Sequence, residues 1–468
     1  MKITTQEKKS EAQPKKVVRV VFTEKNQTRF VEDASNTTRI EVKINKADRD
    51  NFRKSIKVVR RVVRIAQQYH VAVIAIDFTE FDKVSKLPAK EMASMVAQNL
   101  TVAHYEFRDF KTKPKTGWKD LKEVILTHIS QKAVIDGIAE GKIIGEMVNE
   151  CRMISNTPGG DMTPQILAGH AKRLSQKTTI KTTVLGKKEI EKLGMGAILG
   201  VAKGSPEEPK FIVMNYQGGK KDERPIVLIG KGVTFDSGGI NLKPSESILG
   251  MHMDMSGGSA VMTSIALIAQ LKLKKNVIGL IPSVENMASG SSFRPGDVLK
   301  SMSGKTIEII NTDAEGRLIL ADAITYAKRF NPKAVIDVAT LTGASLVALG
   351  QHASAIMTRD KKLQDTLMEL GEQTGDYVWP LPLWEEYEAD VKGQIADIAN
   401  LATRNARYGG SINGGVFLLQ FAKDLPKDCA WAHIDMAPRM TTIPTDNLSS
   451  GAAGEPVRLL TKFVAEWK

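Results

Sequence analysis

Short apolar segments alternate with segments of helix length along most of the chain, and this alternation limits the fold more than any other feature. Four of the apolar segments have the length and composition of buried strands: Val71–Phe78, Pro225–Gly230, Lys275–Val284 and Lys333–Leu341. Helix-length segments lie between them, which is the order of parallel strands joined by helices. The sequence therefore predicts an α/β fold.

A stretch rich in proline and glycine at residues 158–164 divides the chain into two parts. We predict a small N-terminal α/β domain at residues 1–150, which includes the start of a linking helix. A larger α/β domain with a mainly parallel or mixed central sheet is predicted at residues 151–468. Hydrophobic residues make up 42% of the chain and charged residues 25%, which excludes disorder over most of its length.

The N-terminal domain is expected to begin with a charged tail, residues 1–16, which contains no apolar run. Beyond the tail, β-branched residues predict strands, and periodic apolar residues predict helices between them. The strands are expected at Val17–Phe22, Thr38–Ile44, Val71–Phe78 and Glu123–Ile129, and the helices at Ala47–Tyr69, Ala89–Glu106 and residues 130–154.

Positive charge is concentrated in the N-terminal domain. The chain carries a net charge of +13, and residues 1–150 contain 29 basic and 20 acidic residues. On the first predicted helix, basic residues recur every three or four positions and predict a basic outer face: Arg53, Lys54, Lys57, Arg60, Arg61 and Arg64. Such a face could attract DNA, and the alternative is a solvated surface that keeps the protein in solution.

The chain lacks the signals of an exported or membrane protein. Only two cysteines occur, Cys151 and Cys429, and neither belongs to a CxxC motif. The first residues contain no apolar run, and no apolar segment approaches the roughly 20 residues of a membrane span. We therefore expect a cytoplasmic protein without a membrane partner.

Seven charged residues of the larger domain lie near the predicted ends of strands or the starts of helices, where α/β proteins keep their sites. Three separate segments contribute them, so four carboxylates are expected to converge at one place. The seven residues are Lys231, Asp236, Lys243, Asp254, Asp313, Glu315 and Arg317.

Four carboxylates in a small volume need counter-charge, because like charges about 4 Å apart repel by several kcal/mol at intermediate dielectric. Two divalent cations would supply it, and a carboxylate-bridged metal pair can activate water and polarise a carbonyl for hydrolysis. The alternatives are that Asp254 or Asp313 caps a helix and that the lysines are ion-pair partners. No HExxH or HxH motif occurs, and His252 is not expected to be a ligand.

Several motifs of the larger domain resemble those of the leucyl aminopeptidase family, the dinuclear-metal cytosolic aminopeptidases. The most specific is NTDAEGRL at Asn311–Leu318. The family's order of motifs is kept along the chain by GKGVTFDSGGINLKP and MDMSGG before this segment and by DVATLTGA, WAHIDMA and GEPVRLL after it. The resemblance covers roughly residues 150–468. It implies a two-domain protein with a macro-domain-like N-terminal domain and a C-terminal catalytic domain.

The resemblance also implies a role for each charged residue. Asp236 and Glu315 would bridge two metal ions, and Asp313 would bind one of them, while Asp254 and Lys231 would complete the other. The ions would be Mn²⁺ or Zn²⁺, with Mg²⁺ and Co²⁺ as alternatives.

Two further charged residues would act in catalysis. Lys243 would stabilise the developing oxyanion, and Arg317 would hold a bicarbonate that serves as the base.

The same resemblance indicates the substrate and the assembly. Met251, Thr340, Leu341 and Gly343 match the pocket for the N-terminal side chain of a peptide, which favours leucine or methionine. The family forms homohexamers. Ile248 and His252 depart from the family pattern and put the substrate preference in doubt, so a dinuclear hydrolase of another amide stays an alternative.

Overall fold

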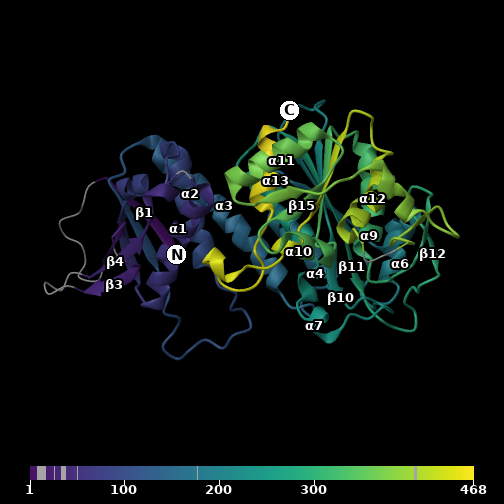
Figure 1. The fold of residues 1–468 in the computed structure, drawn as a ribbon, viewed down its shortest axis with the longest axis horizontal. Coiled ribbons are helices and arrows are strands. Elements are labelled where there is room, and N and C mark those ends of the chain that lie inside the picture. Colours follow the sequence, from purple (N-terminus) through teal and green to yellow (C-terminus); the bar gives the residue numbers. More distant parts are fainter. Residues whose placement is uncertain (8–16, 26, 33–37, 50, 177, 405–407) are drawn as a thin grey trace. The chain divides into compact units, whose positions relative to one another are not determined.

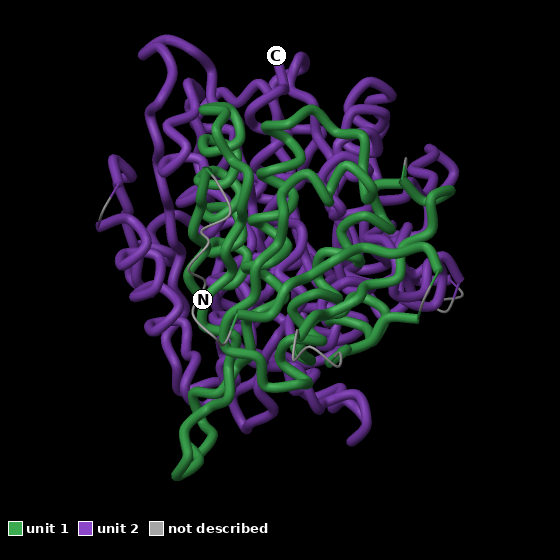
Figure 2. The backbone as a smooth tube through the Cα atoms, turned by 90° about the vertical axis from the view of Figure 1, so that its left-hand side faces the viewer, with its two compact units in different colours: residues 1–149, 442–451 green, residues 150–441, 452–468 purple. Residues whose placement is uncertain are grey.

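The computed structural model describes residues 1–7, 17–25, 27–32, 38–49, 51–176, 178–404 and 408–468. The chain forms two compact units. Figure 2 shows them in different colours. The N-terminal unit consists of Met1–Asn149 and Thr442–Gly451, and the C-terminal unit consists of Glu150–Thr441 and Ala452–Lys468.

The N-terminal unit is built on a six-stranded sheet with the order β1-β6-β5-β2-β4-β3. All neighbouring strands are parallel except β3, which runs antiparallel to β4 at one edge. The four expected strands are confirmed, whereas β1 lies within the segment interpreted as a charged tail. The strands are β1 (Lys2–Gln6), β2 (Val18–Thr23), β3 (Arg29–Glu32), β4 (Thr38–Lys43), β5 (Val73–Asp77) and β6 (Glu123–Thr127).

Three helices belong largely to this unit: α1 (Phe52–Gln68), α2 (Ala89–His104) and α3 (Lys132–Asn156). The first begins five residues later than expected, because the Asn51 side chain accepts a hydrogen bond from the Lys54 amide at 3.2 Å and caps the helix. Its apolar stripe packs into the core against the sheet and α2.

The predicted basic outer face of α1 is partly wrong. Arg60 is buried; its Nε donates to Asn99 Oδ1 at 2.8 Å and its Nη1 to the Asp446 carbonyl at 3.2 Å. Lys54 is paired with Asp48 and Arg64 with Glu106. The buried position of Arg60 has a physical reason, since an amide oxygen and a carbonyl oxygen satisfy its guanidinium.

The C-terminal unit contains a nine-stranded mixed sheet, which confirms the predicted mixed α/β class. Its order is β16-β15-β18-β14-β9-β11-β8-β7, and β10 pairs with β11. The four central strands β18, β14, β9 and β11 run parallel, and β7 and β8 are antiparallel to their neighbours. At the other edge, β15 runs antiparallel to β18 but parallel to β16. The strands are β7 (Lys181–Leu185), β8 (Lys210–Gln217), β9 (Ile226–Gly230), β10 (Gly232–Asp236), β11 (Asn276–Asn286), β14 (Ala334–Ala339), β15 (Ser354–Met357), β16 (Val378–Pro380) and β18 (Ala430–Asp435).

Helices cover both faces of this sheet (Figure 1). On one face α9, α6 and α12 bury a large core in which Val227 and Ile229 meet Leu320, while α8 packs against β9, β11 and β14. A second sheet has three short strands: β12 (Val298–Lys300) and β13 (Thr306–Glu308), which come before α9 in the chain, and β17 (Ile398–Ala399), which comes after it. The helices are α4 (Pro164–Ser175), α5 (Lys187–Lys192), α6 (Gly196–Ala202), α7 (Ser245–Ile248), α8 (Ser256–Gln270), α9 (Gly316–Ala327), α10 (Gly343–Leu349), α11 (Lys361–Thr374), α12 (Gly410–Ala422) and α13 (Val457–Glu466).

Among the described residues, no helix has both the length and the apolar character needed to cross a membrane.

Candidate metal centre

The predicted site residues lie at the carboxyl ends of neighbouring strands. Lys231 directly follows β9, Asp236 ends β10, and Thr340 directly follows β14. β9 and β14 are adjacent parallel strands, and the Lys231 amide donates to the Val338 carbonyl at 3.0 Å. The short segment before α8 supplies Asp254, and the loop between β13 and α9 supplies Asp313 and Glu315.

Three carboxylates form a cluster that could hold a cation. One oxygen each from Asp236, Asp313 and Glu315 lies within 4.8 Å of the others. Asp254 is connected to this cluster through Lys231, whose Nζ lies 2.7 Å from Asp254 Oδ2 and 2.7 Å from Glu315 Oε1. The structure therefore brings together the four carboxylates, although their roles as ligands stay predictions.

The two lysines lie between these carboxylates. Lys231 is 2% exposed and also donates to the Thr340 carbonyl at 3.0 Å. Lys243 Nζ lies 2.8 Å from Asp236 Oδ2 and 2.5 Å from Asp313 Oδ1. Two ammonium groups thus face four carboxylates, and the buried cluster has an excess of negative charge.

Burial and the excess of negative charge raise the pKa values of two of the clustered carboxylic acids, Asp236 and Asp254. Burial, together with the Glu315 charge, raises the pKa of Asp236 to about 7, and burial raises the pKa of Asp254 well above its ordinary value. Glu315 differs, because although burial opposes ionisation, the Lys231 and Lys243 charges outweigh burial and lower its pKa.

The carboxylates in turn hold the pKa of Lys231 above its ordinary value despite its burial.

The donor set fits divalent cations. Three carboxylate oxygens of the site are buried: Asp254 Oδ2, Asp313 Oδ1 and Glu315 Oε1. Each lies at ion-pair distance from a lysine nitrogen. However, no donor meets them with the geometry of a hydrogen bond. Buried polar atoms normally have such partners. Carboxylate oxygens suit Mg²⁺ and Mn²⁺, and a neutral amine among the ligands suits Zn²⁺ and other transition metals.

Two groups that the sequence did not reveal hold Asp236 in place. Its Oδ1 accepts hydrogen bonds from Asn286 Nδ2 at 2.8 Å and from the Gly238 amide at 2.9 Å, which leaves Oδ2 directed at Lys243. Gly238 has φ +88°, and a Cβ there would lie 2.4 Å from the Asn241 carbonyl oxygen. The one available signal was Asn286, a polar residue that ends a largely apolar strand.

Asn400 organises the loop that carries Asp313 and Glu315. This fully buried side chain accepts from the Ile310 amide at 2.8 Å and donates to the Asn311 carbonyl at 2.6 Å. Its own carbonyl accepts from Arg317 Nη1 at 2.9 Å. No periodic pattern in the sequence marks this residue.

Arg317 lies at the start of α9 and is 3% exposed. Burial lowers the pKa of its guanidinium to about 10, although Glu315 and Asp435 oppose this effect. Its Nε is buried without a hydrogen-bond partner, so the guanidinium retains donor capacity for an anion.

Of the four residues expected to bind the substrate side chain, Thr340 contacts one of the clustered carboxylates. Thr340 donates from its hydroxyl to Asp254 Oδ1 at 2.7 Å, and the Leu341 amide donates to Asp435 Oδ1 at 3.0 Å. Met251 is half-buried three residues before Asp254, and Gly343 begins α10 with open space around its Cα.

His252 is half-buried and does not belong to the carboxylate cluster.

A methyl group at residue 316 is expected to disturb the centre. A Cβ on Gly316 would lie 2.6 Å from Lys231 Cε and 2.7 Å from Nζ. Three oxygens fix this Nζ. We therefore expect Gly316→Ala to lower kcat/KM for a reaction at this centre by about tenfold or more, in line with the effect of ~1 Å misplacements.

The matched control is Gly169→Ala in α4, where nothing lies within 4 Å of the new Cβ. It should leave kcat/KM unchanged and stabilise the protein by roughly 0.4–1 kcal/mol. Full activity of Gly316→Ala would contradict the described packing of Lys231.

Comparisons with known proteins identify the family of the chain. Residues 149–461 match the model described as "Cytosol aminopeptidase family, catalytic domain". The chain belongs to the cytosol aminopeptidase family. It is 41% identical to the "Probable cytosol aminopeptidase" of Methylobacillus flagellatus over 90% of this chain and 82% of that protein. It is 42% identical to the protein of the same description from Alkalilimnicola ehrlichii, over 79% of this chain and 73% of that protein.

A solved structure has the same fold over nearly the whole chain. The "Bottromycin maturation enzyme BotP in complex with Mn" superposes with a TM-score of 0.86 at 28% identity, covering 97% of this chain and 99% of that one. The family resemblance predicted from the motifs is therefore confirmed. The family establishes a metal-dependent aminopeptidase that acts on peptides, and the residue roles, the metals and the side-chain preference are not established by it.

Proposed function

We propose that the protein removes N-terminal leucine, methionine or other apolar residues from peptides with two divalent metal ions bound at the carboxylate cluster. The observation that carries this proposal is the convergence of Asp236, Asp313 and Glu315 within 4.8 Å. Family membership supports the reaction class.

In this proposal Asp236 and Glu315 would contribute to holding both ions. Asp313 would help hold one ion through its carboxylate and main-chain oxygen, and Asp254 and Lys231 would help hold the other. The ions are Mn²⁺ or Zn²⁺, with Mg²⁺ and Co²⁺ as alternatives, and a manganese complex of the structural neighbour BotP supports the choice of a divalent ion.

When bound, the metal pair would acidify a water molecule and polarise the scissile carbonyl. The Lys243 ammonium would donate a hydrogen bond to the negative oxygen that develops on the scissile carbonyl. Since this ammonium now contacts Asp236 and Asp313, binding of cations competes with it for the same oxygens.

Arg317 would hold a bicarbonate ion, which would supply a general base for the reaction. The unpartnered buried Nε of Arg317 supports an anion at this position.

The preference for apolar residues rests on Met251, Thr340, Leu341 and Gly343. Leu341 is half-buried, packs against the core that contains α9 and α12, and follows Thr340, which contacts Asp254, so it could offer an apolar surface to a substrate side chain.

The proposal is tested by removing and restoring the metals. After treatment with a chelator, hydrolysis of leucyl and methionyl amides should fall to background, and Mn²⁺ or Zn²⁺ should restore it. Lysyl and glutamyl amides should be cleaved at least about tenfold more slowly, the discrimination expected of an apolar pocket. Chelator-resistant turnover would refute the metal-dependent mechanism, whereas equal rates for all four amides would refute only the preference.

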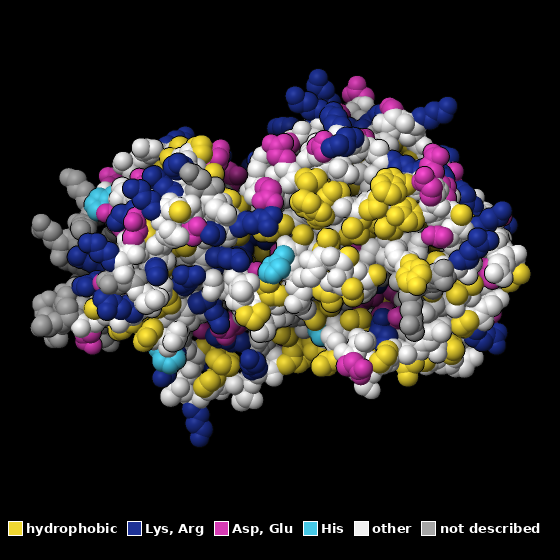
Figure 3. All heavy atoms as spheres, viewed as in Figure 1, with side chains coloured by type: hydrophobic (Ala, Val, Ile, Leu, Met, Phe, Trp, Pro, Cys, Tyr) yellow, Lys and Arg dark blue, Asp and Glu magenta, His cyan; other side chains and the backbone are white. Residues whose placement is uncertain are grey.

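We further propose a cytoplasmic homohexamer. Several large apolar side chains are exposed on the C-terminal unit, among them Val347 at 88% and Leu249 at 86%, and Figure 3 shows apolar areas on its visible face. Exposed apolar surface of this kind suits contacts between copies. A monomeric mass in light scattering would contradict the proposal.

DNA binding by the N-terminal unit is a second proposal. Lysine and arginine side chains are frequent on the visible face of this unit (Figure 3), and Arg53 and Lys54 are exposed. Affinity for duplex DNA should fall steeply as salt rises, because phosphate contacts release counterions. Absence of binding at low salt would end this proposal.

A further inference from the structure

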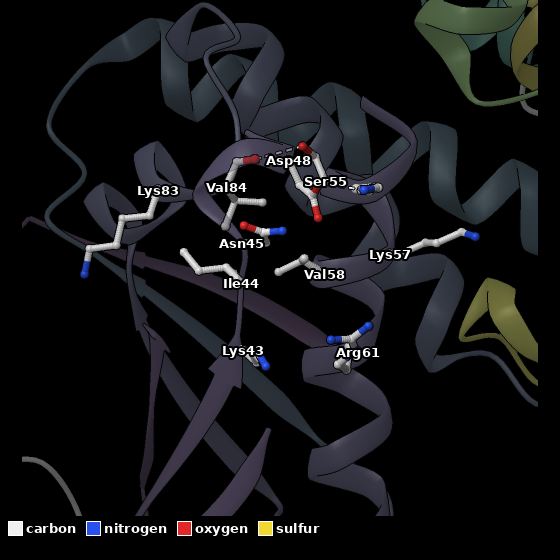
Figure 4. A pocket seen from close by; sticks show the side chains of 11 residues that line it. Lys43, Ile44, Asn45, Asp48, Ser55, Lys57, Val58, Arg61, Lys83 and Val84 are labelled. Carbon is white, nitrogen blue, oxygen red and sulfur yellow. Dashed lines mark hydrogen bonds and ion pairs between the residues drawn. The ribbon is translucent and has the colours of Figure 1, made fainter. Parts of the chain in front are cut away.

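The N-terminal unit contains a hollow at the carboxyl end of its sheet. The hollow has a volume of about 220 Å³ and lies between the end of β4, the first turns of α1 and the segment that follows β5. Figure 4 shows Ile44, Asn45, Val58 and Val84 at its centre. The carboxyl edge of parallel strands is where ligands bind in open α/β sheets.

Positive charge surrounds this centre. Five of the lining residues are cationic and one, Asp48, is acidic; the cations are Lys43, Lys54, Lys57, Arg61 and Lys83. In Figure 4, Lys43 and Arg61 lie on one side, and Lys57 and Lys83 extend to opposite sides. The hollow therefore has a cationic rim and a less polar centre.

Three of these cations have no carboxylate partner. Lys54 pairs with Asp48 at 2.6 Å and Lys83 with Glu80 at 2.5 Å. Within the part of the chain that the structure describes, Lys43, Lys57 and Arg61 form no ion pair. Like charges gathered at one rim repel each other, and a bound anion would relieve the repulsion.

The centre of the hollow limits the kind of anion. Ile44 and Val84 are buried and Val58 is half-buried, so the floor offers apolar contact, and the Asn45 side chain provides an amide beside it. The volume lies below the range of roughly 300–1,000 Å³ typical of whole-ligand pockets. A ligand would therefore place one small group in the hollow and its charge on the rim.

We propose that this hollow binds a phosphate monoester that carries a small apolar or aromatic group, such as a nucleoside monophosphate. The planar guanidinium of Arg61 matches two phosphate oxygens, and Lys43 and Lys57 add point charges. All lining residues belong to the N-terminal unit, whereas the metal centre belongs to the C-terminal unit. The site is thus independent of the proposed peptidase reaction.

The test is calorimetric titration of the full-length protein at low salt with adenosine monophosphate, adenosine and inorganic phosphate. Adenosine monophosphate should bind most tightly. The double variant Lys57→Gln/Arg61→Gln should weaken its binding by about tenfold or more, which corresponds to ~1.4 kcal/mol.

The matched control is Lys111→Gln/Lys113→Gln, which removes the same charge from exposed positions outside the hollow and should bind like the unmodified protein. Both double variants should keep the melting temperature and the far-UV circular dichroism spectrum of the unmodified protein, which shows that they are folded.

Four results would overturn the proposal. The first is absence of adenosine monophosphate binding at millimolar concentration, and the second is equal weakening in the control variant, which would indicate general attraction to a basic surface. The third is equal affinity for inorganic phosphate, which would remove the role of the apolar floor. The fourth is that duplex DNA without terminal phosphates binds through Lys57 and Arg61 while adenosine monophosphate does not bind. That result would assign the rim to the phosphodiester backbone of a nucleic acid.

Discussion

Replacing Asp236 with asparagine is expected to lower kcat/KM for leucyl amides by at least about a thousandfold, which corresponds to ~4 kcal/mol of lost transition-state stabilisation. Asparagine can still accept the hydrogen bonds from Asn286 Nδ2 and the Gly238 amide. Its amide group, however, carries no negative charge and would direct N–H bonds toward Lys243 and any bound cation. The variant should therefore fold normally but lose the bridge between the two proposed metal ions.

The control for this variant is Asp360→Asn. Asp360 caps α11 by accepting from the Leu363 amide at 3.0 Å, and asparagine caps helices equally well. This control should keep both its activity and its melting temperature, measured under the same conditions. If Asp236→Asn retains more than about a tenth of the kcat/KM, a drop of only ~1.4 kcal/mol, the carboxylate does not bridge catalytic metals.

Replacing Lys231 with methionine is expected to destabilise the metal-free protein strongly. Its ammonium lies 2.7 Å from both Asp254 and Glu315, and all three side chains are at most 5% exposed. Methionine fills a similar volume but leaves the two carboxylates without their counter-charge. Breaking a buried ion pair in this way costs roughly 3–5 kcal/mol, so the melting temperature measured in chelator should fall by several degrees.

Divalent ions should recover much of this loss, because they bring positive charge back to the same carboxylates and bind the folded protein preferentially. The control is Lys333→Met, which removes a pair with Glu223 at 3.0 Å nearer the surface and should cost less than about 1 kcal/mol. Equal melting temperatures for the two variants in chelator would contradict the described environment of Lys231.

The fold of both units was predictable where local pattern and tertiary environment agree. Apolar β-branched segments such as Ile226–Gly230 and Ala334–Ala339 became adjacent buried parallel strands. Their carboxyl ends lie side by side, and this is why charged residues far apart in the sequence could be expected to converge.

The sequence could not reveal elements that depend on distant partners. β1 has little apolar character, and its pairing with β6, for example Lys2 with Glu123, is a main-chain interaction. Arg60 looked like a surface residue because its acceptor at Asp446 is 386 positions away. Tertiary contacts of this kind override periodicity, since a polar side chain becomes buried only when a partner satisfies it.

The same limit applies to the candidate site. The seven charged residues of the site lie in motifs with a distinctive spacing, so the sequence alone identified them as candidate site residues. Asn286 and Asn400 act through hydrogen bonds to segments 50 and 89 residues away, and no spacing marks them.

The central claim is that the carboxylate cluster binds two divalent ions. The most direct test is the metal content per chain, measured by elemental analysis after reloading with Mn²⁺ or Zn²⁺ and removal of free metal, for the unmodified protein and Asp236→Asn in parallel. The account predicts two ions per chain in the unmodified protein and a clear loss in the variant. Equal content in both proteins, or no bound metal in a fully active enzyme, would contradict it.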